Sequence, residues 1–127
     1  MRKIGLIYCA GSLTPRGAFD PNPAIEYLGN IRKQIKAAKE LLLHGFSPFC
    51  PALDFLLFLM LNDNEKISEE QIKKFSLDWL AVSDAVLLIE GWQTSLGTAK
   101  EIEFAMARGI PVFKSLQELE DFQKEGK

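Results

Sequence analysis

The sequence predicts an α/β fold, a three-layer doubly wound parallel sheet of about four to five strands. Short apolar runs of strand length alternate with longer segments whose apolar residues recur every three or four positions. Such alternation is typical of a parallel sheet with helices on both faces. The 127 residues show no linker or repeat, so we expect a single domain over residues 1–127.

The predicted elements follow one another as strand and helix, four times over. The predicted strands cover 3–10, 46–51, 84–92 and 110–114, and the predicted helices 24–44, 68–83, 95–108 and 115–126. Ser68 with Gln71 has capping-box spacing, and Ser95 and Ser115 stand where N-caps belong. Gly45 ends the first helix. This order is typical of Rossmann-like and flavodoxin-like folds.

Composition excludes several classes of function. The net charge is −2, which gives no bulk basic field for a nucleic-acid polymer or an anionic membrane. The apolar run at the start is too short for a signal peptide, and "FLLFLML" (55–61) is too short to span a bilayer. We therefore expect a cytoplasmic protein. Cys9 and Cys50 alone predict neither a metal site nor a disulfide framework, and we expect no cofactor.

Ligands of doubly wound folds bind beyond the carboxyl ends of the strands, which nominates residues 8–16, 50–55 and 90–98. The candidates after the first and third strands are small, hydroxyl, aromatic or cationic: Tyr8, Gly11, Ser12, Thr14, Arg16, Trp92, Ser95 and Gly97. Small residues allow close backbone approach, and Arg16 can pair with an anion. A polar connecting loop and a serine that only caps its helix remain the alternatives.

Two glutamates follow Ser95, and helix geometry alone hardly distinguishes them as candidates for a functional role. Glu101 and Glu103 are expected on opposite flanks of an apolar stripe formed by Ala99, Ile102, Ala105 and Met106. Glu101 lies nearer the helix start, where the dipole favours a carboxylate, and small Ala105 at i+4 leaves it room. A solvated surface is the alternative for both.

Three stretches together resemble the nucleoside 2-deoxyribosyltransferase-like superfamily, which includes deoxynucleoside 5′-monophosphate N-glycosidases. They are "IYCAGSLT", "NIRKQIKAAKELLLHGFSPFCP" and "DWLAVSDAVLLIEGWQTSLGTAKEIEFAMARGIPVF". The resemblance runs from Ile4 to Phe113. It is greatest to an uncharacterised bacterial and phage branch, which shares "GW" after the third strand and "FCP" after the second.

The resemblance implies a role for several candidates. Glu101 falls in the register of the nucleophile that attacks the anomeric carbon of deoxyribose, whereas Glu103 inherits no role. Tyr8 would hold that carboxylate in line. Ser12 and Ser95 would bind a 5′-phosphate, with Arg16 as a candidate helper. A carboxylate suits this chemistry because glycosidic cleavage passes through an oxocarbenium-like state.

One departure concerns the acid that would protonate the leaving base. The resemblance implies an aspartate eight residues before Asp84, but that position holds Ser76. Asp78 and, from the loop after the second strand, Asp54 are the candidate substitutes. Two hypotheses therefore stand. The chain is an N-glycosidase or 2-deoxyribosyltransferase for a deoxynucleoside or its 5′-monophosphate, with hydrolysis favoured, or it is a non-catalytic nucleotide-binding or sensing domain.

Apolar side chains outside the predicted strands and helices suggest an interface with another protein chain. Residues 55–61 predict either a buried helix or an interface, and the resemblance favours a homodimer or higher homo-oligomer. We expect Trp79 in the core, and Trp92 either stacked on a base or packed in an interface.

Overall fold

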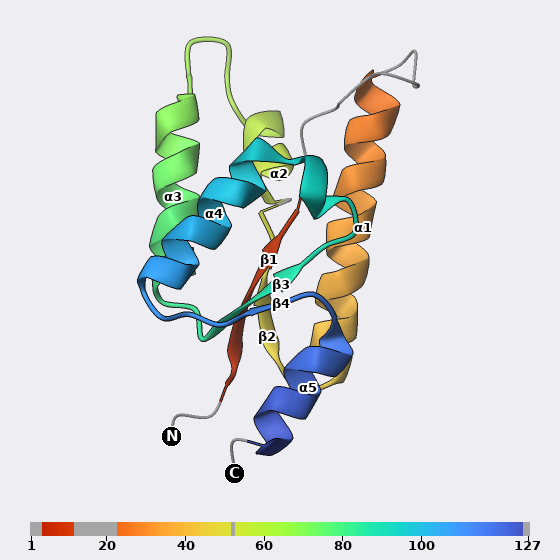
Figure 1. Ribbon diagram of the computed structural model, residues 1–127. Coiled ribbons are helices and arrows are strands. Elements are labelled where there is room, and N and C mark those ends of the chain that lie inside the picture. The colour runs from red at the N-terminus through yellow and green to blue at the C-terminus, as the bar shows by residue number, and fades with distance from the viewer. Residues whose placement is uncertain (1–3, 12–22, 52, 126–127) are drawn as a thin grey trace.

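The computed structural model describes residues 4–11, 23–51 and 53–125, with nine main helices and strands in that part of the chain (Figure 1). In chain order they are β1 (Leu6–Ala10), α1 (Pro23–Leu43), β2 (Ser47–Phe49), α2 (Leu53–Leu59), α3 (Glu69–Ala81), β3 (Ala85–Leu88), α4 (Leu96–Ala107), β4 (Val112–Phe113) and α5 (Leu116–Glu125). A short 3-10 helix, η1 (Trp92–Thr94), precedes α4. The predicted α/β fold is confirmed.

The four strands form one parallel sheet in the order β2-β1-β3-β4. The chain leaves β1 toward β2 and then returns past β1 to β3, so the winding reverses between β1 and β3. In open α/β sheets this switch point is where the connections diverge and leave a crevice at the carboxyl ends of the strands. The topology thus singles out the ends of β1 and β3.

Helices cover both faces of the sheet. In Figure 1, α3 and α4 lie on one side of the strands, and α1 and α5 lie on the other. Each face has its own core. The core on the α1 side includes Ile7, Cys9, Leu41 and Leu119, and the core on the α4 side includes Tyr8, Ala10, Leu80 and Ala105. Alternation along β1 therefore divides its side chains between the two cores.

The helix ends follow the predicted signals. Ser68 and Gln71 form a reciprocal capping box at the start of α3. The Ser115 hydroxyl accepts from the Glu118 amide at 3.1 Å and caps α5. The segment without a clear prediction, residues 52–65, contains α2, a short helix of the connection between β2 and α3.

The buried face of α1 matches only part of the apolar stripe that the spacing predicts, which consists of Ile25, Leu28, Ile31, Ile35, Ala38, Leu41 and Leu42. Ile31 and Leu41 are buried together with Gln34, whereas four residues of the stripe are exposed: Ile25, Leu28, Ile35 and Leu42. The face turned to the sheet is rotated toward Gln34, which makes two polar contacts there, one to the Gly11 carbonyl and one to Cys50. The exposed residues leave an apolar stripe along α1.

Two hydrogen-bonding groups fix the amino-terminal edge of the sheet. Asp84, just before β3, accepts from the amides of Gly5 and Leu6 at 2.9 and 2.8 Å. Gln123 of α5 accepts from the Ile4 amide at 3.2 Å. Asp84 therefore joins the starts of β1 and β3, at the edge opposite to the candidate site.

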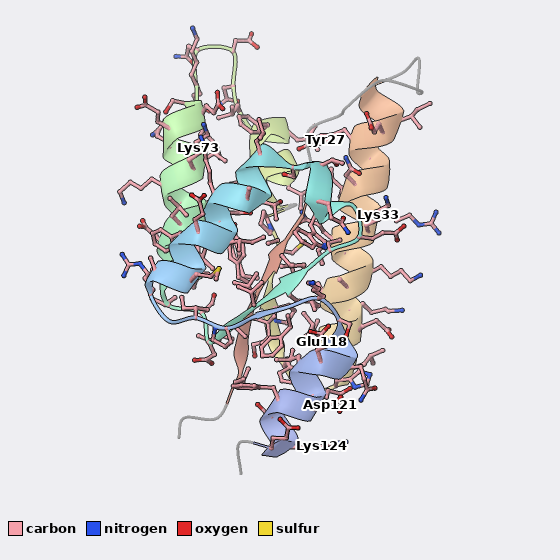
Figure 2. All side chains as sticks on the ribbon, viewed as in Figure 1. Tyr27, Lys33, Lys73, Glu118, Asp121 and Lys124 are labelled. Carbon is pink, nitrogen blue, oxygen red and sulfur yellow. The ribbon has the colours of Figure 1, made fainter. Side chains whose placement is uncertain are left out.

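Charged side chains are spread over the outer helix faces. Figure 2 labels Lys33 on α1, Lys73 on α3, and Glu118 and Lys124 on α5, all of which are exposed. Lys73 pairs with Glu69 one turn earlier at 3.1 Å, an exposed pair of small energetic weight. None of the described helices is both long and apolar enough to cross a membrane.

Adjacent leucines of α1 test the observed face. Leu41 is 0% exposed and Leu42 is 63% exposed. Leu41→Ala should lower the free energy of unfolding by about 2–5 kcal/mol, because it leaves a cavity between α1 and the sheet. Leu42→Ala should change it by less than about 0.5 kcal/mol. Urea unfolding followed by circular dichroism measures both, and equal losses would contradict this orientation of α1.

Candidate functional site

A hydrogen bond between Tyr8 and Glu101 joins β1 to α4. The Tyr8 hydroxyl donates to Oε2 of Glu101 across 93 positions of sequence. Tyr8 is fully buried on the α4 face of the sheet, and Glu101 is half-buried. The two residues that the sequence nominated as an in-line pair are therefore brought together at the β1–β3 switch point.

The face of α4 that carries Glu101 corrects the predicted stripe. Thr98 and Ala105 are buried, Ile102 is half-buried, and Ala99 and Met106 are exposed. The stripe is rotated toward Thr98, so Glu101 lies on the inner side of the helix rather than on an equivalent flank. Glu103 is exposed. Packing of α4 against the rest of the protein therefore distinguishes Glu101 from Glu103. A helical wheel, which shows one helix alone, does not include this packing.

The start of α4 is built by a tight turn and a cap. Gly91 has a left-handed backbone with φ of 92°, which turns the chain from β3 into η1. The Ser95 hydroxyl then accepts from the Thr98 amide at 3.1 Å. No acceptor from the described residues meets the amides of Leu96 and Gly97. The capping prediction for Ser95 is confirmed, and two first-turn amides remain available.

Gly97 and Gly11 differ in the space that a side chain would find at each position. A Cβ on Gly97 would meet nothing nearer than the Ser95 hydroxyl at 3.9 Å, so open space adjoins the helix start. A Cβ on Gly11 would lie 2.7 Å from Cβ of Ile89. Gly11 is therefore explained by close packing against the residue after β3, whatever else it does.

An aromatic stack supports Tyr8 from the side of the β2 edge. The ring of Phe49 stacks on Tyr8 with centroids 5.5 Å apart and on Trp79 with centroids 5.6 Å apart. Trp79 is 48% exposed, so its predicted place in the core is wrong. It lies at the outer end of the stack, with Phe49 between it and Tyr8. Sequence reasoning missed Phe49, although it is the last residue of β2.

Trp92 lies in η1 and is half-buried against the core on the α4 side. Packing of one face onto this core explains the tryptophan without a ligand. Stacking of the exposed part of the Trp92 ring on a base stays a prediction.

The position expected to hold a proton donor, Ser76, and the candidate substitute Asp78 both lie on α3. Ser76 is buried on α3. The Asp78 side chain is 62% exposed and forms an ion pair with Lys74 at 2.8 Å. Ser12 and Arg16 lie outside the described residues, and so does the side chain of Asp54 in α2. Asp78 therefore points to solvent, as its position two residues beyond Ser76 suggests.

One polar atom near the site lacks a partner. The Thr98 hydroxyl oxygen is buried and forms no hydrogen bond. Leaving such a group unsatisfied costs about 1–3 kcal/mol. Thr98 lies one turn before Glu101 on the same face of α4. Among the described residues, no group of three His, Cys, Asp or Glu side chains could hold a metal ion.

Comparison with known proteins identifies a family without an assigned activity. Residues 24–115 match the sequence model of a family described as a domain of unknown function (DUF7768). The match covers more than half of the chain and includes Ser95, Gly97 and Glu101, but begins after Tyr8. No curated protein matches the sequence.

Removal of the Tyr8 hydroxyl tests the link between β1 and α4. Tyr8→Phe should lower the free energy of unfolding by about 1.5–3 kcal/mol, since a hydrogen bond to a carboxylate is lost in a largely buried setting. Chemical unfolding measures the loss. Glu103→Gln on the exposed face should stay within about 0.5 kcal/mol of the parent chain. A Tyr8→Phe variant as stable as the parent would contradict the bond.

Proposed function

The chain belongs to the DUF7768 family, whose description assigns no activity, and from its site we propose that it cleaves the N-glycosidic bond of a 2′-deoxynucleoside or its 5′-monophosphate. Hydrolysis is favoured over base transfer, because nothing in the described residues marks a second base site. The proposal rests on the Tyr8–Glu101 pair at the switch point of the sheet.

The position of the carboxylate supports this chemistry. A nucleophilic carboxylate must be held in one direction, and the phenol of Tyr8 holds Oε2 of Glu101. The start of α4 lies one turn earlier and offers the amides of Leu96 and Gly97 beside the Ser95 cap. Helix starts of this kind attract phosphate groups. A nucleotide with its phosphate at the helix start would place its sugar toward Glu101.

The reaction would proceed in two steps. Glu101 attacks the anomeric carbon, a C–O bond forms, and the C–N bond breaks with its electron pair leaving on the base. The base takes up a proton from solvent as it departs. Water then attacks the same carbon, gives up a proton to solvent, releases the Glu101 carboxylate and yields free deoxyribose or its 5-phosphate. Tyr8 keeps the carboxylate oriented in both steps.

One observation favours a second candidate function. The expected acid is a buried serine, Ser76, and Asp78 is directed to solvent. A general acid contributes roughly 10²–10⁴-fold to rate, so a site without one suits binding better than turnover. The alternative is a non-catalytic domain that binds or senses a nucleotide at the same place. In either case the ligand is a small nucleoside or nucleotide, which is consistent with a cytoplasmic protein.

Chromatography for released base separates the two functions. The four deoxynucleoside 5′-monophosphates and the four deoxynucleosides are incubated with the purified chain. We expect free base from at least one of them. Glu101→Gln should lower the rate by several orders of magnitude, because the amide is a poor nucleophile. Glu103→Gln, its matched control on the exposed face of the same helix, should keep the parent rate.

Two other outcomes would count against the enzyme. Equal loss of activity in both glutamine variants would remove Glu101 from its role. Absence of base release, combined with a nucleotide-dependent rise in melting temperature, would favour the binding domain.

We also propose that the chain is a homo-oligomer whose interface includes α2 and its continuation. Five consecutive apolar residues there are exposed: Leu56, Leu57, Phe58, Leu59 and Met60. An apolar surface of this kind marks interaction sites. The stripe on α1 is a second exposed apolar surface.

Light scattering after size exclusion tests this proposal. The parent chain should have the mass of at least two copies, and Leu59→Glu should yield the single-chain mass, because a charge would be buried at the interface. Ile35→Glu on the α1 stripe is the matched control and should leave the mass unchanged. A monomeric parent chain, or dissociation by Ile35→Glu only, would contradict an interface at α2.

A further inference from the structure

The sheet register brings the two cysteines side by side. β1 and β2 are parallel neighbours, and their last paired residues are Tyr8 and Phe49. The next residue on each chain is a cysteine, so Cys9 faces Cys50. Neighbouring strands lie about 4.8 Å apart, and disulfides join residues with Cα atoms about 4.4–6.8 Å apart. The backbone spacing therefore suits a bond between them.

Both side chains lie on the α1 face of the sheet. Cys9 is a member of the core on that side, and Tyr8 before it belongs to the opposite core. The Cys50 thiol donates to Oε1 of Gln34, a buried residue of α1, at 3.3 Å. Gln34 therefore locates the Cys50 sulfur beneath α1, on the same side as Cys9. Both residues carry thiols in the structure.

The two thiols differ in access, and burial makes the Cys9 thiol a weak acid. Burial, followed by the charge that Cys50 would carry, raises the pKa of Cys9 to about 12. Cys9 is fully buried, whereas Cys50 is half-buried. An external oxidant can therefore reach Cys50 first, and Cys9 is suited to act second, from within the fold. This division of roles is that of an attacking and a resolving cysteine.

We propose that Cys9 and Cys50 form a reversible disulfide between β1 and β2 when the protein meets a small-molecule disulfide such as oxidised glutathione. The Cys50 thiolate attacks one sulfur of oxidised glutathione, whose S–S bond breaks and releases one glutathione thiolate. The Cys9 thiolate then attacks the Cys50 sulfur and expels the second glutathione. The protein loses two thiol hydrogens, and one oxidised glutathione becomes two reduced molecules.

Formation of the disulfide would affect the carboxyl end of β1 through Gln34. The amide of Gln34 donates to the Gly11 carbonyl at 3.3 Å, while its carbonyl accepts from the Cys50 thiol. Oxidation removes that thiol hydrogen and so removes one of the contacts that orient Gln34. The disulfide thus acts on the residue that fixes the end of β1.

Mass spectrometry of the full chain tests the proposal. Reduced protein is incubated with oxidised glutathione, then native and denatured samples are alkylated in turn with two different reagents. We expect the mass of a single, uncross-linked chain to fall by two hydrogens and both cysteines to resist alkylation, with dithiothreitol restoring both thiols. Closure of the Cys50 mixed disulfide should accelerate about tenfold per pH unit up to the pKa of Cys9.

Single variants show which thiol acts first. Cys9→Ser should stop at a stable glutathione adduct on Cys50, and Cys50→Ser should remain unmodified in the native state. Circular dichroism on both variants checks that they are folded. A parent chain that stops at the mixed disulfide, cross-links between copies, or stays reduced would overturn the proposal.

Discussion

The pairing of β1 with both β2 and β3 is the constraint on which the other features depend. β1 is the only strand in the described sheet that contacts β2, and the reversal of winding occurs on its other side. Its side chains alternate between the two faces, so neighbouring residues serve different layers. Tyr8 meets Glu101 on the α4 side, while Cys9 enters the core beneath α1. A shift of register by one residue would exchange these roles.

Polar groups at the two ends of β1 fix that register. At the amino end Asp84 accepts from two amides of the segment entering β1, and at the carboxyl end Gln34 donates to the Gly11 carbonyl. An alternative register would separate these two amides and this carbonyl from their partners and so lose the hydrogen bonds. Apolar packing alone fixes alignment less sharply, because many apolar contacts are exchangeable. The polar contacts thus give the central strand a unique position.

Sequence reasoning reached the elements but not their exact faces. Strand and helix periods and caps such as Ser68 and Ser95 are local, so the fold followed from them. The buried face of α1 depends on Gln34, whose polar partners Gly11 and Cys50 follow β1 and β2 and cannot be identified from the sequence of the helix alone. The exposure of Trp79 and the meeting of Cys9 with Cys50 depend on sheet order and register, which periodicity does not specify.

The choice between Glu101 and Glu103 also shows that sequence periodicity does not specify which side of a helix faces the sheet. Local spacing placed Glu101 and Glu103 symmetrically, and a resemblance, rather than packing, separated them. In the structure the separation comes from the inward rotation of α4 toward Thr98, which brings Glu101 to Tyr8. That rotation depends on contacts of the whole helix with the sheet.

A purely structural account of Glu101 is incomplete. Tyr8 needs only an acceptor for its buried hydroxyl, and a glutamine of equal length would supply one without a charge. Placing an ionised carboxylate in a half-buried position costs more than placing a neutral amide there. The unpartnered Thr98 hydroxyl lies one turn before Glu101 on the buried face of α4. Natural proteins most often keep an unsatisfied polar group of this kind at positions where folding is not the only requirement, which is why this face of α4 is the natural place to test the proposal.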